Sequence, residues 1–545
     1  MKASELFVKC LENEGVEYIF GIPGEENLDL MDALLGSSIT FVTTRHEQGA
    51  AFMADVYGRL TGRAGVCLAT LGPGATNLIT GVADANMDHA PVLAIAGQAA
   101  THRLHKESHQ VLDLVNLFEP ISKYSAQILH PEIIPEVVRK AFKVAQTEKP
   151  GASFIDLPEN IAAMELFEEK SPLLVQGPMP PNPPAAKVEY AAGLIREASF
   201  PIVMAGNGVL RGRASGALVS FAEKLHIPVA TTFMAKGAFP FSHPLSLGAV
   251  GLQSHDYINC GFDRADVVIC VGYDMVEYHP HLWNPTKETK IIHIDPVPAE
   301  VDEHYILAVG VVGDIGNALG AISAMAGQSR ADYGESLHTM LSAEMASYAS
   351  DAGFPVKPQK VIWDLREALG PDDIVISDVG AHKMWMARMY QAERPGTCII
   401  SNGFASMGIA LPGAIAAKLV HPERTVVAVT GDGGFLMNSQ EIETAMRIGV
   451  PIIILVWQDS TYGLIKWKQD VRFGRESNIG FNNPDLVGYA ESFGAKGYRV
   501  GSSEELLPLL RRAAGDDTVV VIDCPVDYRE NLKLTSRLGE LVCPL

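Results

Sequence analysis

Apolar and polar positions along the chain alternate between short apolar runs and longer stretches with apolar residues at helical spacing. Residues 3–14 show helical spacing, and the apolar runs 18–20 and 39–42 follow them. Similar runs occur at 202–205 and 267–271, again separated by helical stretches. Unbroken apolar strands that alternate with helices are typical of parallel sheets covered by helices. The pattern therefore predicts an α/β protein built on parallel sheets.

A proline-rich segment marks the clearest boundary between domains. Residues Gly177–Pro184 read GPMPPNPP, a composition typical of a linker. A polar helical stretch at 330–350 leads to a third segment, which begins near Lys357. The expected domains are 1–170, 188–325 and 357–530, followed by a C-terminal tail at 531–545.

The stretch 425–462 combines two predicted strands with acidic residues at their ends. A β-branched run at 425–430 predicts a buried strand, which stops at Gly431-Asp432-Gly433-Gly434. These glycines predict a tight turn that lets the backbone approach a ligand closely. A helical pattern follows at about 438–448, and a second apolar strand at 452–457 ends at Gln458-Asp459-Ser460-Thr461.

The two acids at these strand ends are candidates for a metal site. Adjacent parallel strands end at the same edge of a sheet, so Asp432 and Asp459 are expected to converge there, beside a helix start. Mg²⁺ usually takes one or two carboxylates and completes its shell with phosphate and water. A lone Gly-Asp-Gly is more often a simple turn, and Asp459 could be a local cap. The second acid favours Mg²⁺ that holds a diphosphate.

Glu47 lies where the predicted strand 39–42 gives way to an alanine-rich helix that runs through Arg59. A carboxylate at such a place has two interpretations. It can be a helix N-terminal residue favoured by the helix dipole, or a buried acid with a chemical task. Spacing alone favours the first interpretation.

Length and composition set outer limits on the function. The 545 residues allow roughly three domains. The formal net charge of -21 disfavours nucleic acid and anionic membranes as partners. Seven scattered cysteines without a Cys-x-x-Cys fit a reducing compartment. We find no apolar stretch of membrane-spanning length, and residues 1–20 form an amphipathic pattern rather than a signal peptide. We expect a cytoplasmic protein with neither membrane nor nucleic acid as partner.

The motifs together resemble thiamine-diphosphate-dependent enzymes. The order of strand, Gly-Asp-Gly, helix, strand and polar pair resembles the signature of that cofactor. The segment Arg45-His46-Glu47-Gln48, with Gly72-Pro73-Gly74-Ala75-Thr76-Asn77 downstream, is similar to the pyrimidine-binding domain of the acetohydroxyacid synthase group. The resemblance implies three doubly wound domains (pyrimidine-binding, central and diphosphate-binding) and the cofactors thiamine diphosphate and Mg²⁺.

The resemblance also implies roles for individual residues. Glu47 would hydrogen-bond N1′ of the aminopyrimidine and favour the imino tautomer that activates the cofactor. Gln110 would face the reacting carbon and stabilise developing oxyanion charge. Met407 would wedge beneath the cofactor, and Ala405 would offer its carbonyl to the 4′ nitrogen. The implied metal ligands are Asp432, Asp459 and Thr461. The implied cofactor-binding residues are Gly24, Glu47, Pro73, Asn77, Val379, Gly380, Ala381, His382, Ala405, Met407, Gly431, Asp432, Gly433, Gly434 and Tyr462.

The central domain departs from the FAD-binding members of this group. Gly206-Asn207-Gly208 begins a dinucleotide-like motif, but Arg211 takes the place of its third glycine. Asp274 stands where the FAD-binding members carry an arginine, and an acid there would repel a pyrophosphate. His109 replaces their phenylalanine, so the His-Gln pair resembles catabolic acetolactate synthases. We expect no FAD and a mostly structural central domain.

The implied reaction is condensation of two pyruvates to 2-acetolactate with loss of CO2. The alternatives are another thiamine-dependent 2-oxo acid decarboxylase or carboligase, or an FAD-dependent pyruvate oxidase. A homodimer is the expected minimum unit, within a tetramer and without a regulatory subunit. Trp467 falls one position short of the tryptophan that selects 2-ketobutyrate in biosynthetic relatives, and Lys468 takes its place. The resemblance therefore leaves the acceptor open.

Overall fold

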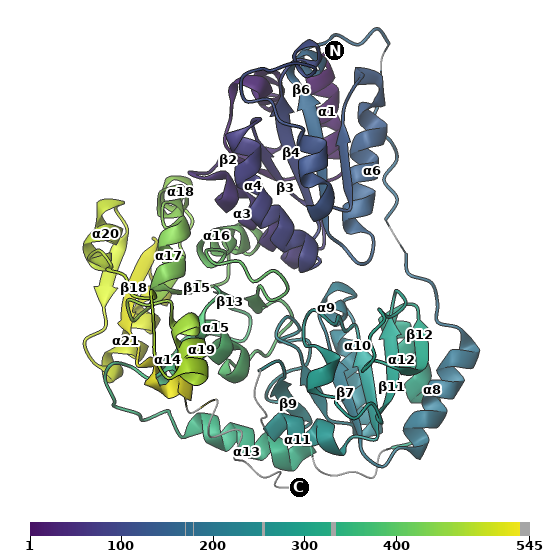
Figure 1. Cartoon of the computed structure of the whole chain (residues 1–545), viewed down its shortest axis with the longest axis vertical. Helices are drawn as coiled ribbons and strands as arrows, with labels where there is room; N and C mark the ends of the chain where they lie inside the picture. Colours follow the sequence, from purple (N-terminus) through teal and green to yellow (C-terminus); the bar gives the residue numbers. More distant parts are fainter. Residues whose placement is uncertain (169, 178, 253–256, 329–333, 533, 535–545) are drawn as a thin grey trace. The chain divides into compact units, whose positions relative to one another are not determined.

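The structure is a computed structural model that describes residues 1–545 except 169, 178, 253–256, 329–333, 533 and 535–545. Most of the expected tail, with Cys543, thus lies outside the described residues. The described strands form three six-stranded parallel sheets (Figure 1). This confirms the predicted α/β fold. By compactness the chain divides into two units, 1–179 with 403–423 and 436–452, and 180–402 with 424–435 and 453–545.

The first sheet has the strand order β2-β1-β3-β4-β6-β5. Its strands are β1 (Tyr18–Gly21), β2 (Thr40–Thr43), β3 (Gly65–Ala69), β4 (Val92–Gln98), β5 (Tyr124–Gln127) and β6 (Ala152–Pro158). Its helices are α1 (Ala3–Asn13), α2 (Leu28–Leu34), α3 (Glu47–Thr61), α4 (Pro73–Met87), α5 (Leu114–Phe118), α6 (Ile134–Gln146) and α7 (Glu159–Ala162). Alternate residues of β4 and β6 pack with α1 and α6 in one apolar core.

The helices α3 and α4 form a pair that also contacts α16 (Ala410–Val420), which follows much later in the sequence. The imidazole of His46 caps α3 by accepting a hydrogen bond from the Gln48 amide, and α3 ends at Gly62 with φ +71°. Helix α4 begins at Pro73. Proline is favoured at the first helical position, where its missing N–H costs nothing.

The central sheet has the order β12-β11-β10-β7-β8-β9. Its strands are β7 (Pro201–Ala205), β8 (Val229–Thr231), β9 (Ser246–Ala249), β10 (Val267–Val271), β11 (Lys290–Asp295) and β12 (Leu307–Val312). Its helices are α8 (Ala185–Glu197), α9 (Gly208–Arg211), α10 (Ser215–Leu225), α11 (Tyr257–Arg264), α12 (Ile315–Met325) and α13 (Gly334–Ala346). Alternate residues of β7 and β10 enter two separate cores, one with α8, α10 and α12 and the other with α11 and α13. The sheet is therefore covered by helices on both faces.

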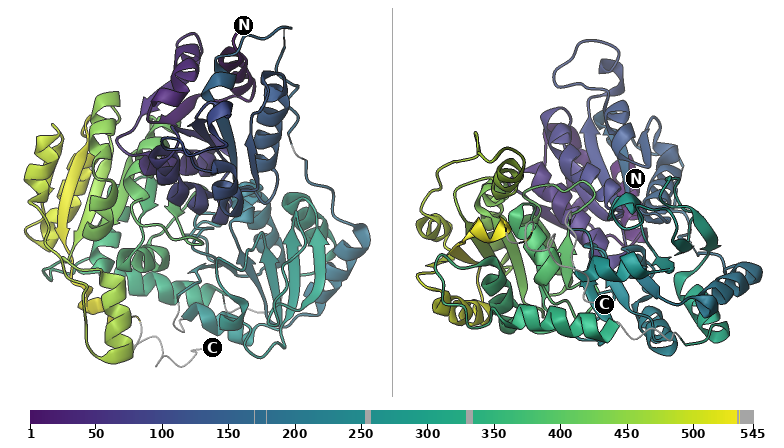
Figure 2. Two further views of the ribbon diagram at one scale, coloured as in Figure 1. Left: turned by 45° about the horizontal axis from the view of Figure 1, so that its top comes forward. Right: turned by 60° about the horizontal axis from the view of Figure 1, so that its bottom comes forward.

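The third sheet repeats the order of the first, as β14-β13-β15-β16-β18-β17. Its strands are β13 (Ile374–Ser377), β14 (Cys398–Ile400), β15 (Val426–Gly431), β16 (Ile453–Gln458), β17 (Lys496–Arg499) and β18 (Val520–Pro525). The helices of this part of the chain are α14 (Pro358–Ala368), α15 (Ala381–Met389), α17 (Asp432–Asn438), α18 (Glu441–Ile448), α19 (Gly463–Phe473), α20 (Leu486–Ser492) and α21 (Ser503–Ala514). The strands and their helices can also be followed in Figure 2.

The predicted turn after the β15 strand is wrong in one respect. Gly431 ends β15, and Asp432, Gly433 and Gly434 form the first turn of α17. Glycine is unfavourable in a helix interior, but an acid at the first position interacts well with the helix dipole. The helix predicted at about 438–448 corresponds to α18, and α17 is an additional helix that occupies the predicted turn.

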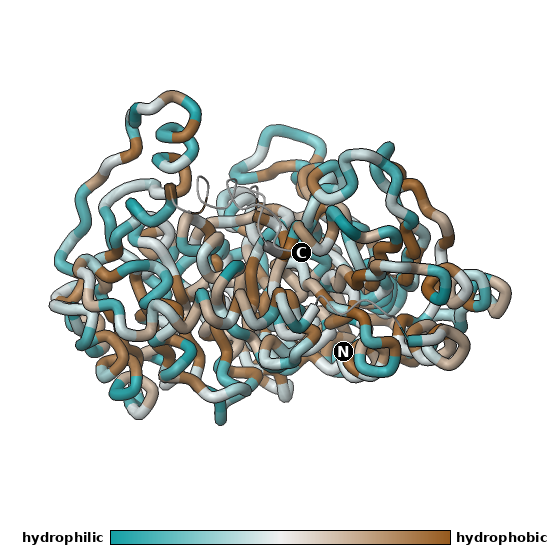
Figure 3. The backbone as a smooth tube through the Cα atoms, turned by 90° about the horizontal axis from the view of Figure 1, so that it is seen from below, coloured by the Kyte–Doolittle hydropathy of each residue, from teal (hydrophilic) through white to brown (hydrophobic). Residues whose placement is uncertain are grey.

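Apolar positions, brown in Figure 3, come in short runs interrupted by hydrophilic positions. Within the described ranges, the helices are all too short or too polar to cross a membrane. The six cysteines that fall in these ranges are buried, as expected for small apolar residues in the core.

Candidate functional site

Asp432 lies at the carboxyl edge of the third sheet, where β15 and β16 run side by side. Only 2% of this residue is exposed. Its Oδ2 accepts hydrogen bonds from the Asp459 amide at 3.1 Å, the Ser460 amide at 2.7 Å and Asn483 Nδ2 at 2.7 Å. Its Oδ1 accepts from the Gly433 amide at 2.9 Å. The structure thus brings the Asp432 carboxylate to the backbone of Asp459, as the strand ends predicted.

The carboxylate of Asp459 is held by Thr461. The Thr461 hydroxyl donates to Asp459 Oδ2 at 2.5 Å. Burial raises the pKa of Asp459 to about 6, and the nearby charge of Asp432 adds to this shift. Burial also raises the pKa of Asp432. Two buried carboxylates at one strand edge repel each other, and a divalent cation would relieve that repulsion.

The residues present fit a magnesium ion that is shared with a phosphate group. In the described part of the chain, we find no set of three or more acidic, histidine or cysteine side chains that could hold a metal. Two carboxylates leave coordination positions for phosphate and water, which Mg²⁺ prefers. The donor set therefore suits Mg²⁺ better than zinc, which favours nitrogen and sulfur ligands.

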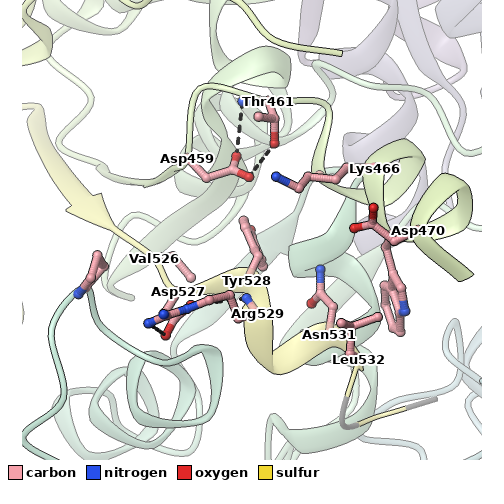
Figure 4. Close-up of a pocket in the computed structure, with 13 residues that line it drawn as sticks. Asp459, Thr461, Lys466, Asp470, Val526, Asp527, Tyr528, Arg529, Asn531 and Leu532 are labelled. Atoms are coloured by element: carbon pink, nitrogen blue, oxygen red, sulfur yellow. Dashed lines mark hydrogen bonds and ion pairs between the residues drawn. The ribbon is translucent and has the colours of Figure 1, made fainter. Parts of the chain in front are cut away.

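A pocket of about 480 Å³ opens beside Asp459 (Figure 4). Its lining includes Lys466, Trp467 and Tyr528. Lys466 lies next to the Asp459 carboxylate in Figure 4 and also forms an ion pair with Glu476 at 2.8 Å. Trp467 is buried against this pocket, whereas Lys468 is exposed. The tryptophan therefore lines the pocket despite its one-residue offset in the sequence.

The strand end after β13 supplies a second group at the same sheet edge. Asp378 Oδ2 accepts from the Thr430 hydroxyl at 2.9 Å. A Cβ atom on Gly434 would lie 2.9 Å from that same oxygen, so only glycine fits there. The predicted cofactor-binding residues Val379, Gly380 and Ala381 continue from Asp378 into the start of α15.

His382, on the first turn of α15, is buried against glycines. Cβ atoms on Gly380 and Gly431 would lie 2.8 and 3.2 Å from atoms of the His382 ring. Burial lowers the pKa of His382 to about 3, so the ring is neutral at physiological pH. Its Nε2 has no hydrogen-bond partner among the described residues. A buried polar atom without a partner is unusual in a protein and marks a place for a ligand.

Tyr462 completes this part of the site. A Cβ atom on Gly433 would lie 3.0 Å from Tyr462 Cε1, and the Tyr462 ring is 5.0 Å from the ring of Phe481. The Phe481 amide in turn donates to the Ser460 carbonyl at 3.0 Å. The loop that carries Phe481 and Asn483 therefore packs along the strand end that carries the acids.

A second group of predicted residues lies in the first compact unit around Glu47. Glu47 is the first residue of α3 and is 9% exposed. Asn77 Nδ2 donates to Glu47 Oε2 at 3.0 Å, and a Cβ atom on Gly74 would lie 3.4 Å from Glu47 Oε1. Thr70 packs against both Gly74 and Gly24. Glu47 is thus both a helix N-terminal residue and a buried acid, so the two interpretations hold together.

Gln110, in the segment between β4 and α5, packs against Gly72, the residue before α4. A Cβ atom on Gly72 would lie 2.9 Å from Gln110 Cβ, and Gln110 itself has φ +58°. The exposed Gln110 is therefore held against the same turn that leads to Pro73 and Asn77. The pair Ala405 and Met407 belongs to the same compact unit, on a loop discussed below.

Two residues of the site were missed by sequence reasoning. Asn483 donates to Asp432 from 51 residues away, in an Asn-Asn-Pro segment with no distinguishing signal. Glu441 accepts from the amides of Arg45 at 3.1 Å and His46 at 3.0 Å, directly before Glu47. An acid at a helix start is common, and its sequence offered no sign of this distant contact.

The central domain does not fit a flavin pyrophosphate. Glu277 accepts from the Asn207 amide at 3.0 Å and from the Thr232 hydroxyl, so a carboxylate occupies the glycine-rich turn. Arg211 pairs with Asp274 at 3.3 Å. Burial and the charge of Asp274 raise the pKa of Glu277 to about 8. A pyrophosphate at this turn would meet two acids whose local donors are already engaged.

Three family profiles match the chain, one in each α/β part. They are the N-terminal TPP binding domain of thiamine pyrophosphate enzymes (residues 1–117), the central domain (188–322) and the C-terminal TPP binding domain (378–524). TPP is thiamine pyrophosphate, also named thiamine diphosphate. The two cofactor-binding profiles cover Glu47 and the Asp432–Asp459 strand ends, respectively.

Relatives that match over nearly their full length are named as acetolactate synthases. A probable acetolactate synthase large subunit of Methanocaldococcus jannaschii is 38% identical, over 100% of this chain and 96% of the relative. An acetolactate synthase of Bacillus subtilis is 37% identical, over 99% and 97%. A catabolic acetolactate synthase of Raoultella terrigena is 35% identical, over 98% and 97%. The similarity extends over essentially the entire chain of each relative.

Proposed function

Because this chain belongs to the acetolactate synthase family of thiamine pyrophosphate enzymes, we propose that it condenses two pyruvates to 2-acetolactate and CO2. The observation that carries this proposal is the two-part arrangement of acids. Glu47 is buried beside Asn77 in one unit, and Asp432 is bonded to the backbone of Asp459 in the other. A thiamine-dependent enzyme needs both an acid for the aminopyrimidine and a metal site for the diphosphate.

The proposed site residues form two groups, one that binds the cofactor and one that transfers protons. When bound, thiamine diphosphate supplies the carbon nucleophile and the electron sink for decarboxylation. Asp432, Asp459 and the Thr461 carbonyl would hold Mg²⁺ and through it the diphosphate. The strand-end residues Val379–His382, with Gly431, Gly433, Gly434 and Tyr462, would surround the phosphates. Their amides at helix starts suit an anion.

The residues around Glu47 would act on the aminopyrimidine of the cofactor. Glu47 would share a proton with N1′, and Asn77 would hold the carboxylate in place. Ala405 would accept at the 4′ amino group through its carbonyl, and Met407 would support the folded cofactor from below. Gln110, held against Gly72 before α4, would donate to the oxygen of the reacting 2-oxo acid.

The remaining properties are proposals of the same kind. A homodimer would be the minimum unit, because family resemblance implies that each cofactor lies between the first domain of one subunit and the third of another. We propose a tetramer, a cytoplasmic location and a catabolic role without FAD or a regulatory subunit. The domain limits 1–170, 188–325 and 357–530, with a tail at 531–545, are proposed on the same basis.

Product analysis tests the function directly. Purified protein with thiamine diphosphate, Mg²⁺ and pyruvate should give one 2-acetolactate and one CO2 for every two pyruvates consumed. Acetaldehyde without acetolactate would identify a simple decarboxylase instead, and flavin absorbance in the purified protein would identify a pyruvate oxidase. Adding 2-ketobutyrate to the same reaction would measure acceptor preference.

A further inference from the structure

Four buried charged side chains form a cluster on α3 and α4. Arg59 Nε donates to Asp55 Oδ1 at 2.5 Å, and its Nη2 donates to Asp55 Oδ2 at 3.0 Å. Nη2 also donates to Asp84 Oδ2 at 2.9 Å, and Nη1 donates to Asp88 Oδ2 at 3.0 Å. The three acid side chains are fully buried, and that of Arg59 is nearly so. One guanidinium thus joins three carboxylates from two helices.

Asp88 uses its other oxygen on a distant loop. Asp88 Oδ1 accepts from the Gly403 amide at 2.6 Å and from the Phe404 amide at 3.3 Å. A Cβ atom on Gly403 would lie 2.5 Å from that oxygen, so the loop approaches the acid closely only because residue 403 is glycine. The contact joins residues 315 positions apart within one compact unit.

Asp84 makes the matching contact on the far side of Ala405. Its Oδ1 accepts from the Ser406 amide at 3.2 Å. Ala405 between the two contacts has φ +60°, a left-handed conformation that costs an L residue energy and must be imposed by its surroundings. The two acids therefore hold the backbone on both sides of a strained residue.

We propose that Asp84 and Asp88, oriented by Arg59, are positioning residues that set the loop 403–407 for catalysis. The hydrogen bonds from the loop amides to Asp84 and Asp88 fix the direction of the Ala405 carbonyl and the backbone position of Met407. Both groups then contact the aminopyrimidine of the cofactor. The inference rests on the proposed function, which assigns Ala405 and Met407 to the cofactor.

The charge balance of the cluster explains why acidic side chains hold the loop 403–407. One arginine cannot neutralise three carboxylates, and a buried carboxylate without enough donors is costly. The loop amides supply the missing donors, and bonds to an ionised acceptor are stronger than neutral ones. Burial and the neighbouring Asp55 raise the pKa of Asp84 to about 7. Burial lowers the pKa of Arg59, but its three acidic partners outweigh this effect and keep the guanidinium charged.

Asp55 provides a matched control. It pairs with the same Arg59 and is equally buried, but Asp84 and Asp88 are the members that bond the loop amides. Asp55→Ala and Asp88→Ala should lower the thermal midpoint of the intact holoenzyme to a similar degree. If the acids only stabilise the fold, the two variants should also have similar activity.

We expect Asp88→Ala to lower kcat for acetolactate formation at least tenfold, with KM for pyruvate changed less than threefold. Asp55→Ala should keep kcat within threefold of the parent enzyme. Asp88→Asn retains an oxygen acceptor for the Gly403 amide and should restore kcat to within threefold. The near-UV circular dichroism of bound thiamine diphosphate should change in Asp88→Ala and not in Asp55→Ala.

A kcat of Asp88→Ala within twofold of the parent enzyme would overturn the proposal, because the loop would then need no such bond. If Asp88→Ala does not fold, Gly403→Ala applies the same test from the loop side, since it presses a methyl group against Asp88 Oδ1. Its kcat should also fall at least tenfold, and an unchanged kcat would overturn the proposal. The proposed function fails separately, if the parent enzyme makes no acetolactate.

Discussion

Replacing Glu47 by glutamine isolates the proton that this residue is proposed to share with the cofactor. Glutamine has nearly the same size, and its side-chain oxygen can still accept from Asn77 Nδ2, which lies 3.0 Å from Glu47 Oε2. The second oxygen lies in the space beside Gly74, where an amide NH2 also fits. The substitution therefore removes an ionisable proton acceptor and leaves the packing intact.

The expected loss is large because the remaining amide cannot take part in proton transfer. General acid–base catalysis contributes roughly 10²- to 10⁴-fold, which corresponds to about 2.7 to 5.4 kcal/mol of activation free energy at 1.36 kcal/mol per tenfold. Turnover of Glu47→Gln should fall by about this factor. Binding of thiamine diphosphate with Mg²⁺ should change less than about threefold, since the proposed diphosphate ligands are in the other compact unit.

Initial rates of acetolactate formation give kcat, and isothermal titration calorimetry with thiamine diphosphate gives the dissociation constant. Glu26→Gln is a matched control, because Glu26 is also 9% exposed and has a neutral partner, the Thr70 hydroxyl at 2.8 Å. It should retain kcat within about threefold. A Glu47→Gln enzyme that turns over within threefold of the parent would refute the proposed activation.

Three further changes test other parts of the site and fold. Asp459→Asn should retain Mg²⁺-dependent cofactor binding, and complete loss of that binding in calorimetry would show that the second charge is essential. Glu441→Ala should lower kcat about tenfold, because it frees the two amides that precede the catalytic acid, whereas Glu443→Ala on the same helix should leave kcat unchanged. Burial raises the pKa of Asp156 from 3.8 to about 7, so its contribution to stability is present below pH 4 and is lost as the pH rises through 7, by at most about 4 kcal/mol. The thermal midpoint of Asp156→Asn should depend less on pH between 4 and 7, with Asp517→Asn as an exposed control that keeps the parent slope.

The fold was predictable because its signal is repetitive and local. Apolar runs such as 267–271 became strands, and the strand residues alternate between two helix-covered cores, as a parallel sheet requires. Element ends were harder to predict. The glycines after Asp432 predicted a turn, but they lie in the first turn of α17. At that helix start, the helix dipole and the N–H groups without a partner in the helix outweigh the low helix propensity of glycine.

Site residues that lie at the ends of neighbouring strands could be predicted from the sequence. Site residues that are distant in the sequence and meet only in the folded chain could not. Asp432 and Asp459 follow adjacent strands, so strand order alone brought them together. Glu441 accepts hydrogen bonds from two amides hundreds of residues away in the sequence, and Asn483 donates to Asp432 from tens of residues away. No periodicity encodes such a contact, because it depends on the three-dimensional path of two loops.

The surroundings of Asp432 explain why the proposed metal site would contain a second carboxylate, that of Asp459. Four donors, from Gly433, Asp459, Ser460 and Asn483, bond the Asp432 carboxylate and disperse its charge. A carboxylate with that many donors is a weaker metal ligand than a free one, because its lone pairs are shared. Among the described contacts, the Asp459 carboxylate accepts hydrogen bonds only from Thr461. It therefore retains more of its negative charge for the ion. At the proposed metal site, an aspartate at 459 would therefore restore the metal affinity that the bonds to Asp432 reduce, and would offset less of the diphosphate's negative charge.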